Sequence, residues 1–468
     1  MTSLRLQDTL TGKTRLLVPL EPGHVRIYSC GPTVYGPTHI GNFRSFLFAD
    51  LLVRYLRYQG LRVTWVMNIT DIDDRIIAIA AAAGESISAL TERWIVQFKT
   101  DFEALRMTPP DVLPRATEHI DAMAELINQL LEFGNAYRTE DGSIFFRISS
   151  WPAYGRLARL DPSQLQVGER VAADDYGKDD VRDFALWKGP KPGEPVWETS
   201  IGPGRPGWHI ECSAMSMHHL GPSFDIHTGG VDLIFPHHED EIAQSEAATN
   251  QPFVQTWLHC DHLRLGGTKM ARRVGNIARV SDLLAEGTSP RALRYALMAV
   301  HYRQGLEYTE DSIAAATAAV ERLDALVAAL EAYREDRANA ADLHEVLEAT
   351  SARFEAGLDD DLNISPALAA LFDLVRELNR RIADRSLSTA DASRALTFLR
   401  RLDAVLGVLP DPESLPEGAA QLLAARETAR AARDWAGSDR LRAELAAMGV
   451  AVEDTADGQR SRRLEQVR

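Results

Sequence analysis

The sequence has few cysteines and no long hydrophobic run. Its 468 residues include only three cysteines, Cys30, Cys212 and Cys260, which are too scattered for the disulfide framework of a small secreted domain. No uncharged stretch approaches the roughly 20 residues that a membrane-spanning helix needs, and the N-terminus lacks the basic start and apolar core of a signal peptide. We therefore expect a cytoplasmic protein in a reducing compartment, without a membrane partner.

Positive charge is also in short supply. The formal net charge is −16, which excludes a protein that coats nucleic acid non-specifically, because such binding depends on Lys and Arg neutralising phosphates. Residues 421–468 differ, since their nine Arg and eight Asp or Glu give a net charge of +1 and leave −17 for the rest. This contrast is compatible with a solvated Arg-rich helix or with a local surface for nucleic acid.

The hydrophobic pattern predicts an α/β fold at the N-terminal end. Residues 24–31 (HVRIYSCG) read as a short strand, residues 39–60 as a helix that ends at Gly60, and residues 61–71 as a second strand. Strand, helix and strand in this order form a βαβ unit, which implies a parallel sheet with a right-handed crossover. The length of the chain indicates further domains, since single cores rarely exceed roughly 250 to 300 residues.

The later chain divides into segments of different character. Residues 142–207 are broken by Gly and Pro and predict an inserted subdomain. Residues 208–211 (WHIE) resemble a strand, and residues 223–244 restore strand, glycine turn and helix, which predicts a return to the first sheet. After about Ser289 the periodicity predicts a helical bundle, and residues 409–418 form a Pro-rich linker before a small C-terminal module.

A glycine-rich loop follows the first strand, in the sequence YSCGPTVYGPTHIGN. Such a loop, running into a helix N-terminus, offers free backbone N–H groups and the positive end of the helix dipole, which favour a phosphate. His39 adds a donor, and Gly41 lets a nucleotide approach the backbone. From the residues alone, a tight turn with a solvent-facing histidine is an equal alternative.

A second group of residues has the composition of a zinc site. His237 and Glu241 in PHHEDE are four residues apart and share one helix face. Cys30 and Cys212 each follow a predicted strand, and the carboxyl ends of parallel strands share one edge of a sheet. Two thiolates, an imidazole and a carboxylate would then meet beside the glycine-rich loop. The alternative is that both cysteines are small buried hydrophobic residues, as free cysteines usually are.

The third candidate is a basic loop, GGTKMARRVGN at residues 266–276. Lys269, Arg272 and Arg273 in such a loop could close over a polyphosphate, although a solvated surface loop has the same composition. Cys260 in WLHCDHLRL alternates with His262, which predicts one strand face for both. We interpret Cys260 as a packing residue rather than a second metal ligand.

These features together resemble the cysteinyl branch of the class I aminoacyl-tRNA synthetases. HIGN at 39–42 is similar to the HIGH signature, and KMARR at 269–273 takes the place of KMSKS. Further blocks of the same family are NITDIDDRI, DFALWK, GRPGWHIECSAM, FDIHTGGVDLIFPHHEDEIAQS, RYALMAVHYRQGLEYTED and ARAARDWAGSDRLRAELAAMGVAVEDT. The resemblance implies a Rossmann-type parallel sheet with an inserted subdomain, followed by an α-helical bundle and a small C-terminal module.

The resemblance also implies the chemistry and the residues that perform it. The expected reaction activates L-cysteine with ATP and Mg²⁺ to cysteinyl-adenylate and transfers it to tRNA(Cys), with one Zn²⁺ per chain reading the thiol. The implied metal ligands are Cys30, Cys212, His237 and Glu241, and the implied cysteine-binding residues are Cys30, Thr70, Trp208 and Asp232. The implied ATP-binding residues are His39, Gly41, Asn42, Gly229, Gly230 and Arg272, and the implied catalytic residues are His39, Asn42, Lys269 and Arg272.

Two signatures depart from the family pattern. Asn42 replaces the last His of HIGH, a mild change because Asn also donates a hydrogen bond. In KMARR, Arg272 keeps the charge of the second Lys but has a planar guanidinium, and Ala271 and Arg273 replace the two serines.

The expected domains and the competing functions follow from the same resemblance. The expected domains are 1–125 and 206–262 for the two halves of the catalytic domain, 126–205 for the insertion, 263–315 for the KMSKS-like region, 316–410 for a tRNA-binding bundle and 411–468 for an anticodon module. We expect a monomer. The alternatives are a mycothiol-type ligase, which joins cysteine to a small sugar amine, and a weakened paralogue that binds RNA or senses cysteine.

Overall fold

The computed structural model describes residues 2–160, 180, 182–269, 277–411, 418–455 and 458–463. The chain forms two compact units, residues 1–409 and 410–468. Each unit is described by itself below.

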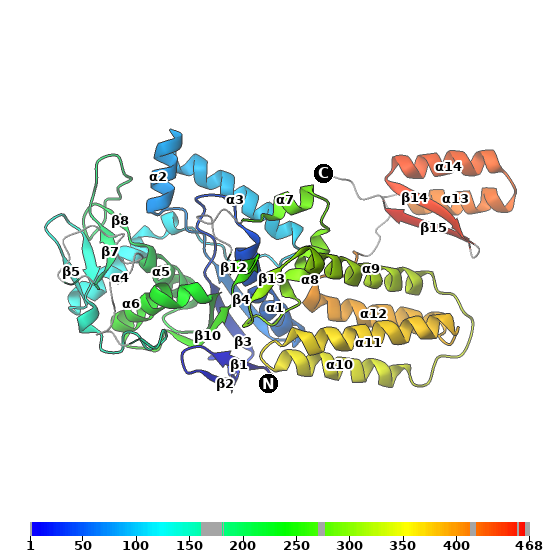
Figure 1. Ribbon diagram of the computed structural model, residues 1–468, viewed down its shortest axis with the longest axis horizontal. Helices are drawn as coiled ribbons and strands as arrows, with labels where there is room; N and C mark the ends of the chain where they lie inside the picture. The colour runs from blue at the N-terminus through cyan, green and yellow to red at the C-terminus, as the bar shows by residue number, and fades with distance from the viewer. Residues whose placement is uncertain are drawn as a thin grey trace. The chain divides into compact units, whose positions relative to one another are not determined.

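A four-stranded parallel sheet lies at the centre of the first unit (Figure 1). Its strands are β3 (His24–Ser29), β4 (Arg62–Met67), β9 (Phe224–Gly230) and β10 (Val254–Cys260). The order is β10-β9-β3-β4, and each neighbouring pair is parallel. The βαβ unit and the α/β fold class predicted from the sequence are therefore confirmed.

Helix α1 (Ile40–Tyr58) makes the crossover from β3 to β4. Of its 19 residues 13 are buried, because it packs against β4 on one side and against helices α8 and α12 on another. Its aromatic residues meet those of α3, where Phe43 stacks on Phe98 with 5.9 Å between ring centres. This packing holds the first turn of α1, which follows the glycine-rich loop, in a fixed position.

The chain between the two halves of the central sheet forms a second sheet. Strands β5 (Ala136–Arg138), β6 (Ile144–Phe146), β7 (Phe184–Lys188) and β8 (Arg205–Pro206) pair antiparallel in the order β5-β6-β7-β8. The helices before it are α2 (Asp74–Ala83), α3 (Ile87–Ala104), η1 (Ala116–Glu118) and α4 (Ile120–Glu132), and η2 (Ile148–Ser150) follows β6. A separate sheet in this region agrees with the inserted segment expected from residues 142–207.

The strand predicted at residues 208–211 is wrong, since these residues begin helix α5 (Trp208–Leu220). All seven residues from Ile210 to Ser216 are buried, so the helix shows no polar face at this point that the sequence could reveal. Gly207 caps its start, and Glu211, Ala214 and Met215 favour a helix. Cys212 therefore lies on the second turn of a helix and not at a strand end.

The predicted return to the central sheet after residue 222 is confirmed. Strand β9 leads through the short turns η4 (Val231–Leu233) and η5 (Ile234–His238) into α6 (Glu239–Thr249). Glu239, Asp240 and Glu241 occupy the first turn of α6, where the positive end of the helix dipole favours carboxylates.

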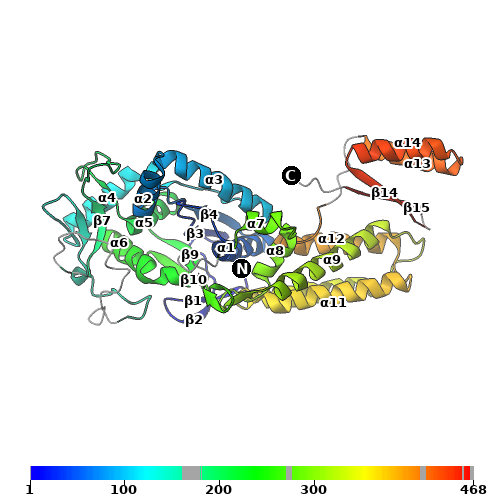
Figure 2. The ribbon, with the colours of Figure 1, turned by 45° about the horizontal axis from the view of Figure 1, so that its top comes forward.

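The rest of the first unit is mainly helical, as predicted. Helices α9 (Glu310–Ala332), α10 (Leu343–Asp359), α11 (Ile364–Ala383) and α12 (Thr389–Leu406) run side by side (Figures 1 and 2). The first unit also contains smaller elements. At the start of the chain these are β1 (Arg5–Asp8) and β2 (Lys13–Leu16), and after β10 they are β11 (Leu263–Leu265), β12 (Thr268–Lys269), α7 (Val280–Ala285), α8 (Pro290–Met298) and β13 (Leu306–Tyr308).

A fully buried ion pair joins this bundle to the sheet domain. Arg294 on α8 donates to the Asp50 carboxylate on α1 at 2.7 Å, and neither side chain is exposed to solvent. The same guanidinium donates to the backbone carbonyl oxygens of Leu406 at 2.6 Å and Leu105 at 3.0 Å. One side chain therefore connects α1, α8, the end of α3 and the end of α12.

The second unit is a small α/β module with its own core. It contains α13 (Ala419–Ala431), α14 (Trp435–Ala447), β14 (Val450–Thr455) and β15 (Gly458–Arg463), and the two strands form an antiparallel hairpin. Ala419, Leu445 and Val450 are fully buried in it. Most of the linker predicted at 409–418 lies outside the described residues. Among the helices that the structure describes, none has the length and apolar character needed to span a membrane.

Candidate metal centre and adjoining pocket

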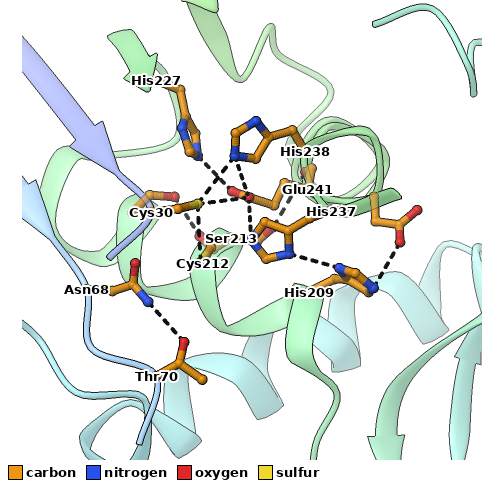
Figure 3. Close-up of polar contacts among 12 residues, drawn as sticks. Cys30, Asn68, Thr70, His209, Cys212, Ser213, His227, His237, His238 and Glu241 are labelled. Atoms are coloured by element: carbon orange, nitrogen blue, oxygen red, sulfur yellow. Dashed lines mark hydrogen bonds and ion pairs between the residues drawn. The ribbon is translucent and has the colours of Figure 1, made fainter. Parts of the chain in front are cut away.

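Four potential metal ligands meet at the edge of the central sheet (Figure 3). Cys30 directly follows β3, Cys212 lies on α5, and His237 and Glu241 lie just before and within the first turn of α6. One ligand atom from each lies within 4.8 Å of the others. The structure thus brings together the four residues expected from the sequence, although the helix that holds Cys212 was not predicted.

The separations of these atoms suit a tetrahedral metal. The sulfur atoms of Cys30 and Cys212 are 3.9 Å apart, and both cysteines are free. Two sulfur ligands at about 2.3 Å from a tetrahedral zinc ion are about 3.8 Å apart. Nε2 of His237 lies 3.1 Å from Oε1 of Glu241, close to the roughly 3.3 Å expected for nitrogen and oxygen ligands of the same ion.

The electrostatics of the cluster favour a bound cation. All four side chains are buried, and burial raises the pKa of the Cys30 thiol and of the Glu241 carboxyl well above their usual values. Burial, together with the neighbouring histidines, lowers the pKa of His237 and keeps its imidazole neutral. A divalent cation at the centre supplies the positive charge that stabilises thiolate and carboxylate forms, and neutral imidazole is the form that binds metals.

A chain of contacts orients His237. Nδ1 of His237 lies 2.9 Å from Nδ1 of His209, and Nε2 of His209 lies 3.3 Å from the Asp240 carboxylate. The carboxylate can only accept, which favours the proton of His209 on Nε2 and leaves its Nδ1 as an acceptor for the Nδ1–H of His237. Nε2 of His237 then presents its lone pair to the cluster. Such outer contacts fix the ligand tautomer in many metal sites.

A second set of ligands overlaps the first. Nε2 of His238 lies 3.3 Å from the Cys30 sulfur, and Nε2 of His227 lies 3.0 Å from Oε2 of Glu241. In the part of the chain that the structure describes, Cys30, His227, His238 and Glu241 therefore form an alternative group of four. Sequence reasoning missed His209, His227 and His238. The only available signal was the density of histidines in WHIE, DIHTGG and PHHEDE.

Through Cys30 the cluster adjoins an open pocket of about 250 Å³, which Cys30 lines. Residues expected from the sequence that line it are Cys30, His39, Gly41, Asn42, Trp208, Gly230 and Asp232, and further lining residues include Ser45, Arg75 and His262. Trp208 is 39% exposed and stacks on His237, with 4.5 Å between ring centres, so it is not an ordinary core residue. The pocket thus runs from the candidate metal ligands to the first turn of α1.

The loop between Cys30 and His39 is pinned to the end of β4. The backbone N–H of Gly31 donates to Oδ1 of Asn68 at 2.9 Å, and the Thr70 backbone exchanges hydrogen bonds with Pro32 and Val34, each 3.1 Å long. A Cβ atom on Gly31 would lie 1.7 Å from the Asn68 carbonyl oxygen, so only glycine fits there. Thr70 itself is buried and does not line the pocket; it holds the loop instead.

His39 caps the N-terminus of α1. Its Nδ1 accepts a hydrogen bond from the backbone N–H of Asn42 at 3.2 Å, and a Cβ atom on Gly41 would lie 3.0 Å from the same nitrogen. This close packing explains why a glycine stands at position 41, two residues after His39. With Nδ1 acting as acceptor, the proton of the neutral imidazole is on Nε2, the nitrogen that can donate to an anion.

The remaining expected residues have other positions. Gly229 does not line the pocket but packs against His238, since a Cβ atom there would lie 2.6 Å from its ring. The backbone of Lys269 belongs to β12, and Arg272 lies outside the described residues. Cys260 ends β10 and is buried, so the strand does not continue to His262 as expected. Among described residues Cys260 belongs to no group of metal ligands, which agrees with a packing role.

Comparisons with known proteins cover the whole chain. Three family models match: the tRNA synthetases class I (C) catalytic domain at residues 16–318, the DALR domain at 353–410 and the cysteinyl-tRNA ligase anticodon binding domain at 413–462. The cysteine–tRNA ligase of Koribacter versatilis is 42% identical over 98% of this chain and 100% of its own, and that of Symbiobacterium thermophilum is 46% identical over 98% and 99%. The methionyl-tRNA synthetase of Mycobacterium tuberculosis, complexed with methionyl-adenylate, shares the fold at a TM-score of 0.59, with 18% identity over 82% of this chain and 90% of that one.

Proposed function

Since the chain belongs to the class I aminoacyl-tRNA synthetases, as a member of the cysteine–tRNA ligase family, we propose that Cys30, Cys212, His237 and Glu241 hold its zinc ion and that the adjoining pocket binds cysteine and ATP. The observation that carries this proposal is the meeting of these four side chains beside the pocket that Cys30 lines. An enzyme of this family joins cysteine to its cognate tRNA at the expense of ATP. The small-amine ligase and the weakened paralogue are not favoured, because the full-length relatives are cysteine–tRNA ligases.

The proposed zinc ion explains how the enzyme distinguishes the thiol of cysteine from the hydroxyl of serine. A hydrophobic pocket discriminates such similar side chains by only about 10- to 200-fold. When bound, zinc supplies a borderline-soft Lewis acid that prefers a substrate thiolate to the harder, more basic hydroxyl of serine. The chain's own residues hold the ligands in place: His209 orients His237, and His227 contacts the second oxygen of Glu241. A separate editing step is then unnecessary.

The other pocket residues position the amino acid. Asp232 lines the pocket and has the negative charge to receive the substrate ammonium group. Trp208, which stacks on His237, closes the side of the pocket next to the metal ligands. Thr70 contributes through the loop that its backbone holds. The cysteine side chain points toward Cys30 in this arrangement, and its carboxylate points toward the ATP.

The first turn of α1 binds ATP. Nε2–H of His39 and the Asn42 side chain donate to phosphate oxygens at the positive end of the helix dipole, and Gly41 leaves room for the nucleotide. Gly230 lines the same pocket, and Gly229 keeps His238 close to the strand. Mg²⁺ accompanies the ATP, and Lys269 and Arg272 neutralise the leaving pyrophosphate. The carboxylate of cysteine attacks the α-phosphate, and the ribose of the tRNA 3′ end then attacks the adenylate.

The two adjacent histidines of PHHEDE provide a test of the ligand set. We expect His237→Ala to be purified with much less than one zinc per chain, because it removes a proposed ligand, and His238→Ala to keep its zinc. Cysteine-dependent ATP–pyrophosphate exchange falls with the metal in the first variant. Both residues are buried and neighbouring, so each is the control for the other. Zinc loss from His238→Ala alone contradicts the proposal and assigns the metal to the set with His227 and His238.

The proposed parts of the enzyme divide the work between ATP chemistry and tRNA binding. The catalytic halves are residues 1–125 and 206–262, the insertion 126–205, the KMSKS-like region 263–315, the tRNA-binding bundle 316–410 and the anticodon module 411–468. The family model for the anticodon binding domain supports the last of these. The proposed state is a monomer.

Removal of the second unit tests this division. We expect a chain that ends at Pro410 to raise the KM for tRNA(Cys) by at least roughly tenfold while ATP–pyrophosphate exchange changes less than about twofold. The reason is that every proposed ATP and cysteine contact lies in the first unit, which has its own core. Steady-state aminoacylation with tRNA transcript measures the first quantity. Equal loss of both activities would show that the module also supports adenylate formation.

A further inference from the structure

Three histidines lie together where the start of α4 meets the end of α5. His119 directly precedes α4, and His218 and His219 occupy the last turn of α5. One ring nitrogen from each lies within 4.8 Å of the others. None of the roles proposed above for catalysis or tRNA binding uses them.

The three rings converge on a small volume. Nε2 of His119 lies 3.0 Å from Nε2 of His219, and the ring of His218 is centred 5.2 Å from that of His119 and 4.8 Å from that of His219. Two nitrogen ligands of a tetrahedral ion, each about 2.0 to 2.1 Å from it, are about 3.4 Å apart. The rings therefore reach a common ion by small side-chain rotations.

The backbone prepares His119 for this role. Its Nδ1 lies 2.9 Å from the backbone carbonyl oxygen of Arg115. Because a carbonyl oxygen only accepts, the proton of the neutral ring is on Nδ1, and Nε2 presents a lone pair to the other two histidines. A ring N–H that donates to a carbonyl is the usual outer contact of a metal-binding histidine.

The local charges also suit a cation. Burial and the two neighbouring histidines lower the pKa of His219 to about 4, so its ring is neutral at physiological pH. The end of α5 carries the negative end of the helix dipole. The nearby Arg115 guanidinium is 2.9 Å from the Glu92 carboxylate, which neutralises its charge.

We propose that His119, His218 and His219 form a second metal site, which takes a divalent transition-metal cation that prefers imidazole, such as Zn²⁺, Ni²⁺ or Cu²⁺. Mg²⁺ and Ca²⁺ prefer oxygen ligands and are poor occupants. His218 is exposed and the other two are partly exposed, so the ion enters from solvent and retains water in its open positions.

The site is separate from the proposed zinc centre but shares a helix with it. Cys212 and His219 are seven residues apart on α5, which corresponds to about 10 Å along the helix axis. An ion at the second site joins the end of α5 to the start of α4 and so fixes the helix that carries Cys212 and Trp208. Its effect is on the stability of this helix pair and not on the chemistry of the pocket.

Calorimetric titration of the full-length protein tests the proposal. The zinc content is first measured, and Zn²⁺ is then added to the zinc-containing protein. We expect one further equivalent to bind, at least roughly tenfold weaker binding in His218→Ala, and unchanged binding in His344→Ala, which removes an exposed histidine of α10. Mg²⁺ is expected to give no binding heat. The proposal is overturned if no further equivalent binds or if His218→Ala binds it as tightly as the unchanged protein.

Two more measurements identify the ligands. Added Co²⁺ is expected to give weak visible bands without thiolate charge-transfer absorption, since three imidazoles provide no sulfur; strong charge transfer would place the ion at Cys30 and Cys212 and overturn the assignment. Added Zn²⁺ is expected to raise the temperature of thermal unfolding in the unchanged protein and in His344→Ala, because it binds only the folded chain. An equal rise in His218→Ala contradicts the proposal.

Discussion

The purified Cys30→Ala protein is expected to lose its zinc and its discrimination between cysteine and serine together. The Cys30 sulfur lies 3.9 Å from both the Cys212 sulfur and the Glu241 carboxylate. Without it the remaining pocket recognises the substrate by size, which supports only about 10- to 200-fold discrimination. We expect the kcat/KM for cysteine in ATP–pyrophosphate exchange to fall by roughly three orders of magnitude.

Cys260→Ala is the matched control for this experiment. Cys260 is also buried, ends strand β10 of the same sheet and belongs to no ligand group among the described residues. We expect it to keep its zinc and its preference for cysteine, with only a modest loss of stability from the smaller side chain. Metal analysis and parallel charging assays with cysteine and serine measure both properties. If Cys30→Ala retained its zinc and its preference, Cys30 would not be a ligand.

The second large effect concerns stability. Arg294→Ala is expected to reduce the free energy of unfolding by about 3 to 5 kcal/mol, because it leaves a cavity and removes the fully buried partner of the Asp50 carboxylate, which among the described residues keeps only Arg54 as an ionic partner, at 2.9 Å. It also removes the donor to the carbonyl oxygens at the ends of α3 and α12. Urea unfolding followed by circular dichroism measures the change.

An exposed pair on the bundle provides the comparison. Arg353 and Asp373 lie 2.7 Å apart, but their side chains are 56% and 38% exposed, so Arg353→Ala is expected to cost less than about 1 kcal/mol. The loss in the Asp50→Ala/Arg294→Ala double variant is expected to be smaller than the sum of the losses in the two single variants, because both single variants remove the same contact. A change below about 1 kcal/mol in Arg294→Ala would contradict this prediction and would mean that Arg54 alone compensates the Asp50 carboxylate.

The helices and strands that could be predicted from the sequence are those whose hydrophobic residues recur with one clear period. The strands around Ile27 and Val66 and helix α1 follow their hydrophobic pattern, and the bundle helices do the same. Helix α5 was missed because Ile210 to Ser216 are buried on every side, which removes the polar stripe that marks a helix. Its four-residue start, WHIE, then resembles a strand.

The candidate site was predictable only in part. Residue types and the family signatures pointed to Cys30, Cys212, His237 and Glu241, since a zinc site needs few and distinctive ligands. The supporting contacts were not predictable, because His209 and His227 come from different elements and reach the cluster through tertiary packing. Thr70 shows the same limit: the family resemblance implied a pocket residue, but its backbone holds the loop.

The pinned loop after β3 gives the pocket a fixed length. Cys30 and His39 are nine residues apart, and the contacts of Gly31, Pro32 and Val34 with the end of β4 prevent the segment from stretching. The proposed site for the substrate sulfur and the proposed site for the phosphate are therefore carried by one short segment that is held at its start. If the proposed sites are right, the length of the amino acid is also selected: homocysteine, which is one methylene longer, is expected to bind through its sulfur but to place its carboxylate badly for attack on the α-phosphate.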